Sequence, residues 1–399
     1  MNIRYPTRLF IIAAILFLCV FFGTSDSMEN LPGSQKGNPH INTDIIQGIE
    51  LLYDWQFDKA EVLLSKIIFE NPMDPAGYFY LSMVSWSRMA AGVWSEENVE
   101  EYKNRIEKTI YIANKNIEKG QANSFTYLYL GGALGYLGRF HLMRHKWFSS
   151  YLVASEAIEA LKKCLSMDPG NRDVLLGLGI YDYYTARLSG VLKFLSYIFF
   201  HKGSKEEGLR KLHITAEEAT YSSIEAKSML LHIYLFLELD FDKARPIADE
   251  MAERFRNGPV HSYLQGVTYI RLDMVSGYRN VVEGLRRRSR KESSPAVASI
   301  WANRADYLEA GYYLFHDQYD NARSNLEAIL SNNEIEKEPY MAAWPLLKIG
   351  MSYDLEGKRE TALEYYNRVL EMENSAGAQF LAEKYILEPV VKGSPFLVF

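Results

Sequence analysis

The sequence predicts an all-α protein, an α-solenoid in which antiparallel helix pairs stack one on the next. Three observations favour this fold class. Apolar residues follow helical spacing, and not the alternation of strands, over residues 42–387. Breaks that contain proline, such as Asn71-Pro72 and Asp168-Pro169, interrupt the pattern at regular places, and proline ends helices because its ring removes a backbone donor. Small residues recur twelve positions apart, and a fixed spacing of this kind indicates a repeat protein.

The first 27 residues have the three parts of a secretory signal peptide. Arg4 and Arg8 precede an unbroken apolar run over residues 9–22, and small or polar residues follow. As a helix this run would span roughly 21 Å, which is short of the roughly 30 Å of a bilayer core. We therefore expect an exported protein, periplasmic or envelope-associated, that loses residues 1–27. An inner-membrane anchor formed by the uncleaved segment is the alternative.

The rest of the chain divides into a leader, a repeat array and a tail. Residues 28–40 are polar and contain Gly, Pro and Ser, which predicts a flexible leader. Residues 41–388 carry the helical pattern, and residues 389–399 form a C-terminal tail that ends in apolar residues. Eight helix pairs are expected at 41–74, 76–119, 122–170, 171–221, 225–258, 259–292, 297–336 and 341–374, followed by a closing helix at 376–388.

The small residues belong to a longer pattern. Gly350 is followed by Tyr353 three residues later, and Ala362 is followed by Tyr366 four residues later. The same spacing of twelve returns between Gly48 and Ala60, and between Ala310 and Ala322. A small residue fits where two helices cross closely, and a large residue fills the gap beside it. This pattern resembles the tetratricopeptide repeat. The second to fourth units depart from it, because they carry insertions.

The resemblance implies a right-handed superhelix whose concave face, lined by the first helix of each pair, binds a protein or peptide segment. It therefore implies a non-catalytic scaffold. Residues at the offsets that line this face in the family are rich in Tyr and Arg, which binding hot spots favour. They are Tyr53, Tyr129, Tyr136, Tyr183, Tyr184, Tyr263, Arg271, Arg304 and Tyr307. An alternative is that several of them are core residues.

A second likeness covers residues 177–235. Gly177-Leu-Gly-Ile-Tyr181 and the later Glu206-Glu207-Gly208 resemble the eukaryotic tetratricopeptide repeat 39 family, which includes a mitochondrial outer-membrane member linked to the clearance of inclusions. This likeness agrees with an alternative function, a membrane-associated adaptor. Such an adaptor would use the apolar residues 188–200 and the basic residues 286–291 on a membrane surface.

Catalytic and metal chemistry find little support in the sequence. His141 and His145 have the spacing of a zinc pair on one helix face, but a third ligand is not apparent and cations surround them. Glycines near residue 135 lack the strand that a phosphate loop requires. Cys164 lies on an apolar helix face, as a buried thiol does. We expect no enzyme activity, no cofactor and no metal.

The amino-acid composition limits the classes of partner that the protein is expected to bind. The net charge of −6 argues against a general nucleic-acid binder. The 28 Tyr and 20 Phe suit helix seams or a binding surface, because a Tyr ring packs while its hydroxyl stays polar. The expected partner is a protein or peptide, with membrane-surface contact as an addition.

Overall fold

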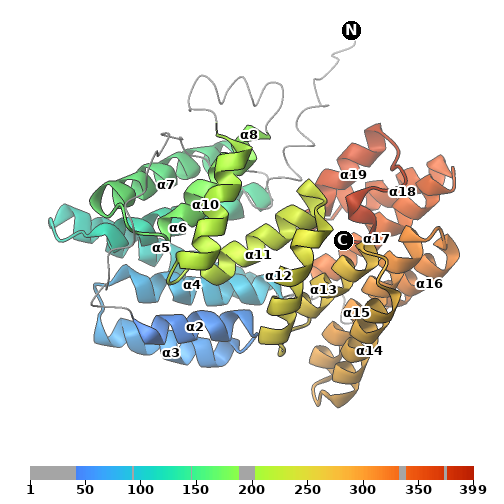
Figure 1. The fold of residues 1–399 in the computed structure, drawn as a ribbon, viewed down its shortest axis with the longest axis horizontal. Helices are drawn as coiled ribbons and strands as arrows, with labels where there is room; N and C mark the ends of the chain where they lie inside the picture. Colours follow the sequence, from blue (N-terminus) through green and yellow to red (C-terminus); the bar gives the residue numbers. More distant parts are fainter. Residues whose placement is uncertain (1–41, 92–93, 145, 188–202, 332–337, 373–374) are drawn as a thin grey trace, which may run out of the picture. The chain divides into compact units, whose positions relative to one another are not determined.

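The computed structural model describes residues 42–91, 94–144, 146–187, 203–331, 338–372 and 375–399. Over this part of the chain the regular elements are all helical, which confirms the predicted fold class (Figure 1). The expectations for the signal segment, for the leader and for residues 188–200 lie outside the described residues. The chain forms two compact units, which we describe separately.

The first unit comprises the described residues up to Ala91 and from Ser95 to Met229. It holds four helix pairs in the described residues, and consecutive helices pack against each other. Its helices are α2 (Thr43–Tyr53), α3 (Phe57–Glu70), α4 (Pro75–Ala90), α5 (Glu96–Glu118), α6 (Ser124–Met143), α7 (Trp147–Met167), α8 (Val174–Ala186), α10 (Lys205–Glu218) and the N-terminal part of α11 (Ser223–Ile233).

The second unit runs from Leu230 to Phe399, with Trp94 assigned to it as well. Here too, consecutive helices pack in pairs. Its elements are the π-helical turn η3 (Tyr234–Glu238), α12 (Phe241–Arg254), α13 (Pro259–Arg271), α14 (Val275–Lys291), α15 (Pro295–Phe315), α16 (Tyr319–Leu330), α17 (Pro339–Leu355), α18 (Arg359–Leu370), α19 (Ala378–Leu387) and the 3-10 turn η5 (Pro395–Leu397).

Each expected helix pair corresponds to one observed pair, and α19 is the expected closing helix. We call α2, α4, α6, α8, α11, α13, α15 and α17 the first helices, and their partners the second helices. Within a unit, first helices also contact one another, as α4 contacts α2 and α6. These contacts form what we call the first-helix layer of that unit.

Local sequence explains where the helices begin. The side chain of Asn42 accepts hydrogen bonds from the first backbone amides of α2, and Asp74 does the same for α4, which has Pro75 at its start. Asn123 and Thr126 form a reciprocal capping box at the start of α6. Such caps supply acceptors for amides that have no partner inside the helix.

A repeated turn joins first to second helices in five pairs. In each, one residue adopts a left-handed conformation with φ between 55° and 78°. These residues are Trp55, Leu239, Asp273, Asp317 and Gly357. In four of the five the next residue donates its amide to a carbonyl five residues earlier, as Lys358 does to Tyr353 at 2.8 Å. This is the Schellman ending of a helix, and its recurrence at a constant place shows that these pairs share one local structure.

The small residues lie where helices cross, as predicted. A Cβ added at Gly350 would lie 2.6 Å from Cε1 of Tyr366, on the partner helix α18. A Cβ at Gly266 would lie 2.3 Å from Leu308, on the neighbouring first helix α15. Ala362 on α18 is fully buried. These crossings leave no room for a larger side chain, which explains the twelve-residue spacing physically.

Candidate functional site

The nine residues expected to line a binding face all lie on first helices. Three of them, Tyr53, Tyr136 and Arg271, are partly exposed. The other six are at most 5% exposed, namely Tyr129, Tyr183, Tyr184, Tyr263, Arg304 and Tyr307. These six side chains belong to the interior and not, as expected, to an open surface. The physical reason is that other helices and, in the second unit, the C-terminal residues cover the first-helix layer.

In α8, the covering element is α10. Gly208 of α10 approaches so closely that an added Cβ would lie 2.4 Å from the backbone nitrogen of Tyr183. The hydroxyl of Tyr184 lies 3.8 Å from the sulfur of Met229, on α11. Both tyrosines therefore fill space between helices.

In α4 and α6, aromatic side chains pack into one cluster. The ring of Tyr136 lies 5.5 Å from that of Trp86 and 6.2 Å from that of Phe79, edge to face in both cases. The ring of Tyr129 lies 5.6 Å from that of Phe79. The guanidinium of Arg139 lies 5.0 Å from the Trp86 ring, in cation–π geometry. Aromatic pairs of this kind stabilise a layer beyond the burial of their area.

A carboxyl group from α11 lies against this cluster. One oxygen of Glu225 accepts a hydrogen bond from the hydroxyl of Tyr53, and the other accepts one from Tyr136 at 3.2 Å. The side chain keeps slight contact with solvent, but the surrounding protein raises the pKa of Glu225 to about 7 by desolvation. Two of the nine expected residues thus meet at an acid that the sequence analysis did not single out.

The second unit has a comparable cluster on α13, α15 and α17. The rings of Tyr263 and Tyr340 each lie 6.0 Å from that of Tyr307. The guanidinium of Arg304 lies 5.2 Å from the Tyr340 ring and 2.5 Å from the carboxylate of Glu338, a buried ion pair. Arg304 therefore binds Glu338 inside the unit.

The last six residues of the chain, Ser394 to Phe399, lie on this cluster, and we call them the tail segment. The hydroxyl of Tyr263 donates a hydrogen bond to the carbonyl oxygen of Val398 at 3.2 Å. The ring of Phe399 lies 4.3 Å from that of Trp344. Leu397 and Val398 are buried, at 2% and 0% exposure. The first-helix layer of the second unit therefore holds a short segment of the chain itself.

We call the residues of η3, α13, α15 and α17 that contact the tail segment the tail seat. They are Phe236, Tyr263, Gly311, Tyr340 and Trp344. The sequence analysis placed only Tyr263 among the binding residues. The terminal apolar run was the signal for the tail, but its docking place depends on long-range contacts, such as that of Tyr263 with Val398 across 135 residues, which local patterns do not encode.

A lysine is buried beneath the tail seat. Lys348 of α17 is fully buried, and its Nζ lies 4.0 Å from the centre of the Tyr307 ring. Among the described residues its ammonium has no hydrogen-bond acceptor, and desolvation holds its pKa well below the ordinary value. The sequence signal was a single Lys inside the apolar run of residues 343–351.

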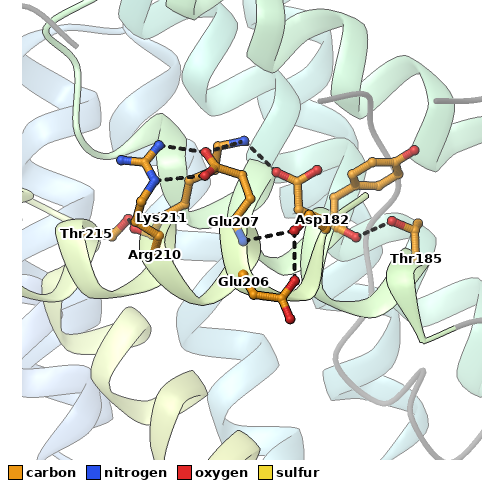
Figure 2. A network of polar contacts seen from close by, with 9 residues as sticks. Asp182, Thr185, Glu206, Glu207, Arg210, Lys211 and Thr215 are labelled. Carbon is orange, nitrogen blue, oxygen red and sulfur yellow. Dashed lines mark hydrogen bonds and ion pairs between the residues drawn. The ribbon is translucent and has the colours of Figure 1, made fainter. Parts of the chain in front are cut away.

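The region of the second likeness contains a polar network between α8 and α10 (Figure 2). The Nζ of Lys211 lies 2.5 Å from a carboxylate oxygen of Asp182, and both side chains are buried. Glu207 contacts Lys211 at 3.6 Å and Arg210 at 2.6 Å. Figure 2 shows Glu207, Arg210 and Lys211 of α10 close together, with Asp182 of α8 beside them. The pair of Lys211 and Asp182 therefore ties α10 to α8, and Glu207 contacts Lys211 from within α10.

The basic run of α14 is largely neutralised within the second unit. Arg286 bonds to Asp306 and Glu309 at 2.9 and 2.8 Å. Arg288 pairs with Glu292 and Arg290 with Glu283. These pairs compete with any anionic surface for the same cations.

Of the remaining chemical candidates, Cys164 and His141 lie in the described residues and His145 lies outside them. Cys164 is fully buried within a cluster that includes Leu161 and Leu175, and desolvation raises the pKa of its thiol to about 12. Among the described residues, His, Cys, Asp and Glu form no group of three that could hold a metal ion. No described helix combines the length and the apolar character needed to cross a membrane.

Comparison with known families and curated proteins gives no match: no family model fits the chain, and no curated protein is similar to it. A proposed function therefore rests on the sequence and on the geometry of the two first-helix layers.

Proposed function

We propose that this protein is a non-catalytic scaffold of the tetratricopeptide type, which binds a segment of another protein on its first-helix layers. The observation that carries the proposal is the tail segment, because the layer of the second unit already accommodates a short stretch of chain whose regular structure is a single 3-10 turn. A surface that buries such a segment between aromatic side chains has the properties of a peptide-binding surface.

The repeated architecture supports the same proposal. Five helix pairs share the left-handed turn residue at one place, and the crossings carry Gly or Ala at a twelve-residue spacing. Stacked pairs of this kind typically present an extended face for binding. The amino-terminal sequence favours an exported protein, and we propose a periplasmic or envelope-associated location.

The membrane-associated adaptor is less well supported. Its basic run is engaged in ion pairs on α14 and α15, and its apolar residues 188–200 lie outside the described residues.

Photocrosslinking in the native cells tests the proposal. A benzoylphenylalanine replaces Tyr53 or Tyr340, which lie on first helices and are partly exposed. Matched controls replace Phe69 and Tyr111, aromatic residues on second helices that are 87% and 53% exposed. We expect discrete protein adducts from the first-helix positions alone. Adducts that form only from Phe69 and Tyr111 would contradict the proposal.

A further inference from the structure

The tail segment is held mainly by its side chains. Its backbone receives one hydrogen bond from the tail seat, between the Tyr263 hydroxyl and the Val398 carbonyl oxygen. Ser394 adds a contact of 3.1 Å with the hydroxyl of Tyr385 on α19. Most of the attachment therefore comes from apolar burial, which is non-directional. Another segment with similar side chains can make equivalent contacts.

The seat selects for aliphatic and aromatic side chains. Leu397 and Val398 are buried, and the Phe399 ring lies among the rings of Phe236, Tyr340 and Trp344 at 4.8, 6.1 and 4.3 Å. An added Cβ at Gly311 would lie 3.4 Å from Cα of Val398, so the helix backbone and the tail are in close contact there. The tail seat therefore fits a segment that passes close to Gly311 and places an aromatic side chain among the three rings.

The buried lysine makes the covered state less stable than it would otherwise be. A Cβ added at Gly311 would lie 3.5 Å from Lys348 Nζ and 3.4 Å from Val398, so the lysine and the tail both approach the same glycine. Keeping an amine without an acceptor out of water costs free energy. If water reaches this group when the tail leaves, the gain offsets part of the apolar contact that is lost.

We propose that the tail seat is a binding site for an apolar peptide segment with aromatic side chains, presented by a partner protein, and that the tail segment occupies this site until the partner displaces it. This inference rests on the proposed function and adds the site and the ligand chemistry. The chain's own sequence Pro-Phe-Leu-Val-Phe is the pattern that such a partner segment resembles.

The full-length chain allows a direct test, because acetylation of Lys348 reports whether the seat is open. The probe is a synthetic peptide with the sequence of residues 391–399, and the control peptide carries Ser in place of both Phe. Phe399→Ala loosens the tail, Tyr263→Phe removes its hydrogen bond while keeping the ring, and Phe69→Ala is the matched control at an exposed Phe.

We expect Lys348 to be protected in the wild type and in Phe69→Ala. In Phe399→Ala its acetylation rate rises by about tenfold or more, because the buried area of one aromatic ring shifts an open–closed equilibrium at least that far. The probe peptide restores protection in a saturable way and binds the loosened variant more tightly than the wild type. The control peptide does neither.

Three results would overturn the proposal. Unchanged protection in both loosened variants means that the tail is a permanent cap. An exposed Lys348 that the probe peptide leaves unprotected means that the seat has no affinity for this chemistry. Protection that returns with protein concentration, together with dimer formation, identifies a second copy as the occupant. Crosslinks from Tyr53 in the first unit do not depend on the tail, so a failure of this inference remains distinguishable from a failure of the proposed function.

Discussion

Replacement of Glu225 by Gln should remove a pH dependence from the stability of the first unit. The carboxyl group of Glu225 has its pKa raised from 4.5 to about 7 because the surrounding protein desolvates it. Below pH 4.5 the group is protonated in both the folded and the unfolded chain. Between pH 4.5 and 7 the folded state keeps the proton while the unfolded chain releases it. The free energy of unfolding therefore falls as the pH rises through this window.

The expected magnitude follows from the same pKa values. Each pKa unit corresponds to about 1.36 kcal/mol, so a rise from 4.5 to about 7 corresponds to ~3 kcal/mol. The wild type should be more stable at pH 5 than at pH 8 by most of this amount, relative to Glu225→Gln. The difference between the two proteins cancels the contributions of other groups, because those are common to both.

Guanidinium unfolding at pH 5 and pH 8, read by pulsed hydrogen exchange, measures the effect. Peptides from α2 and α6 report on the helices that bond Glu225 through Tyr53 and Tyr136. Peptides from α15 and α17 report on the second unit and serve as an internal control. If wild type and Glu225→Gln lose stability equally between the two pH values, the assignment of this carboxyl group is wrong.

Three further substitutions test the packing. Tyr307→Ala should destabilise the second unit by about 3 kcal/mol or more, because the side chain is fully buried. A melting temperature close to that of the wild type would mean that Tyr307 is not a core residue. Gly350→Leu should cost roughly 1–3 kcal/mol or more, because its Cβ would collide with Tyr366, and hydrogen exchange should rise first in residues 341–388. Lys211→Met should destabilise the first unit by about 3–5 kcal/mol by leaving Asp182 buried without its cation. The double replacement with Asp182→Leu should recover most of that loss in denaturant unfolding, and no recovery would argue against the pair.

The repeat architecture was predictable because its causes are local. The spacing of Gly350 and Ala362 reflects one helix crossing, and the capping residues Asn42 and Asp74 act within a few residues. Each of these signals involves residues of a single repeat only. They therefore predicted the succession of helix pairs, while the insertions left the repeat register of the second to fourth units open.

The candidate site was predictable only in part, because its decisive contacts join distant segments. The first helices and their aromatic side chains followed from the repeat, but their exposure did not. Tyr53 meets Glu225 across 172 residues, and Tyr263 meets Val398 across 135. Helical periodicity carries no information about which segment will cover a face. The buried tyrosines and Lys348 are the consequence of those coverings.

The most direct test of the central claim is a hydrogen-exchange footprint of the full-length protein with and without the partner that crosslinking identifies. We expect slower exchange in α13, α15 and α17 when the partner binds, together with faster exchange in the tail segment. Slower exchange confined to the second helices α14, α16 and α18, with an unchanged tail, would contradict it.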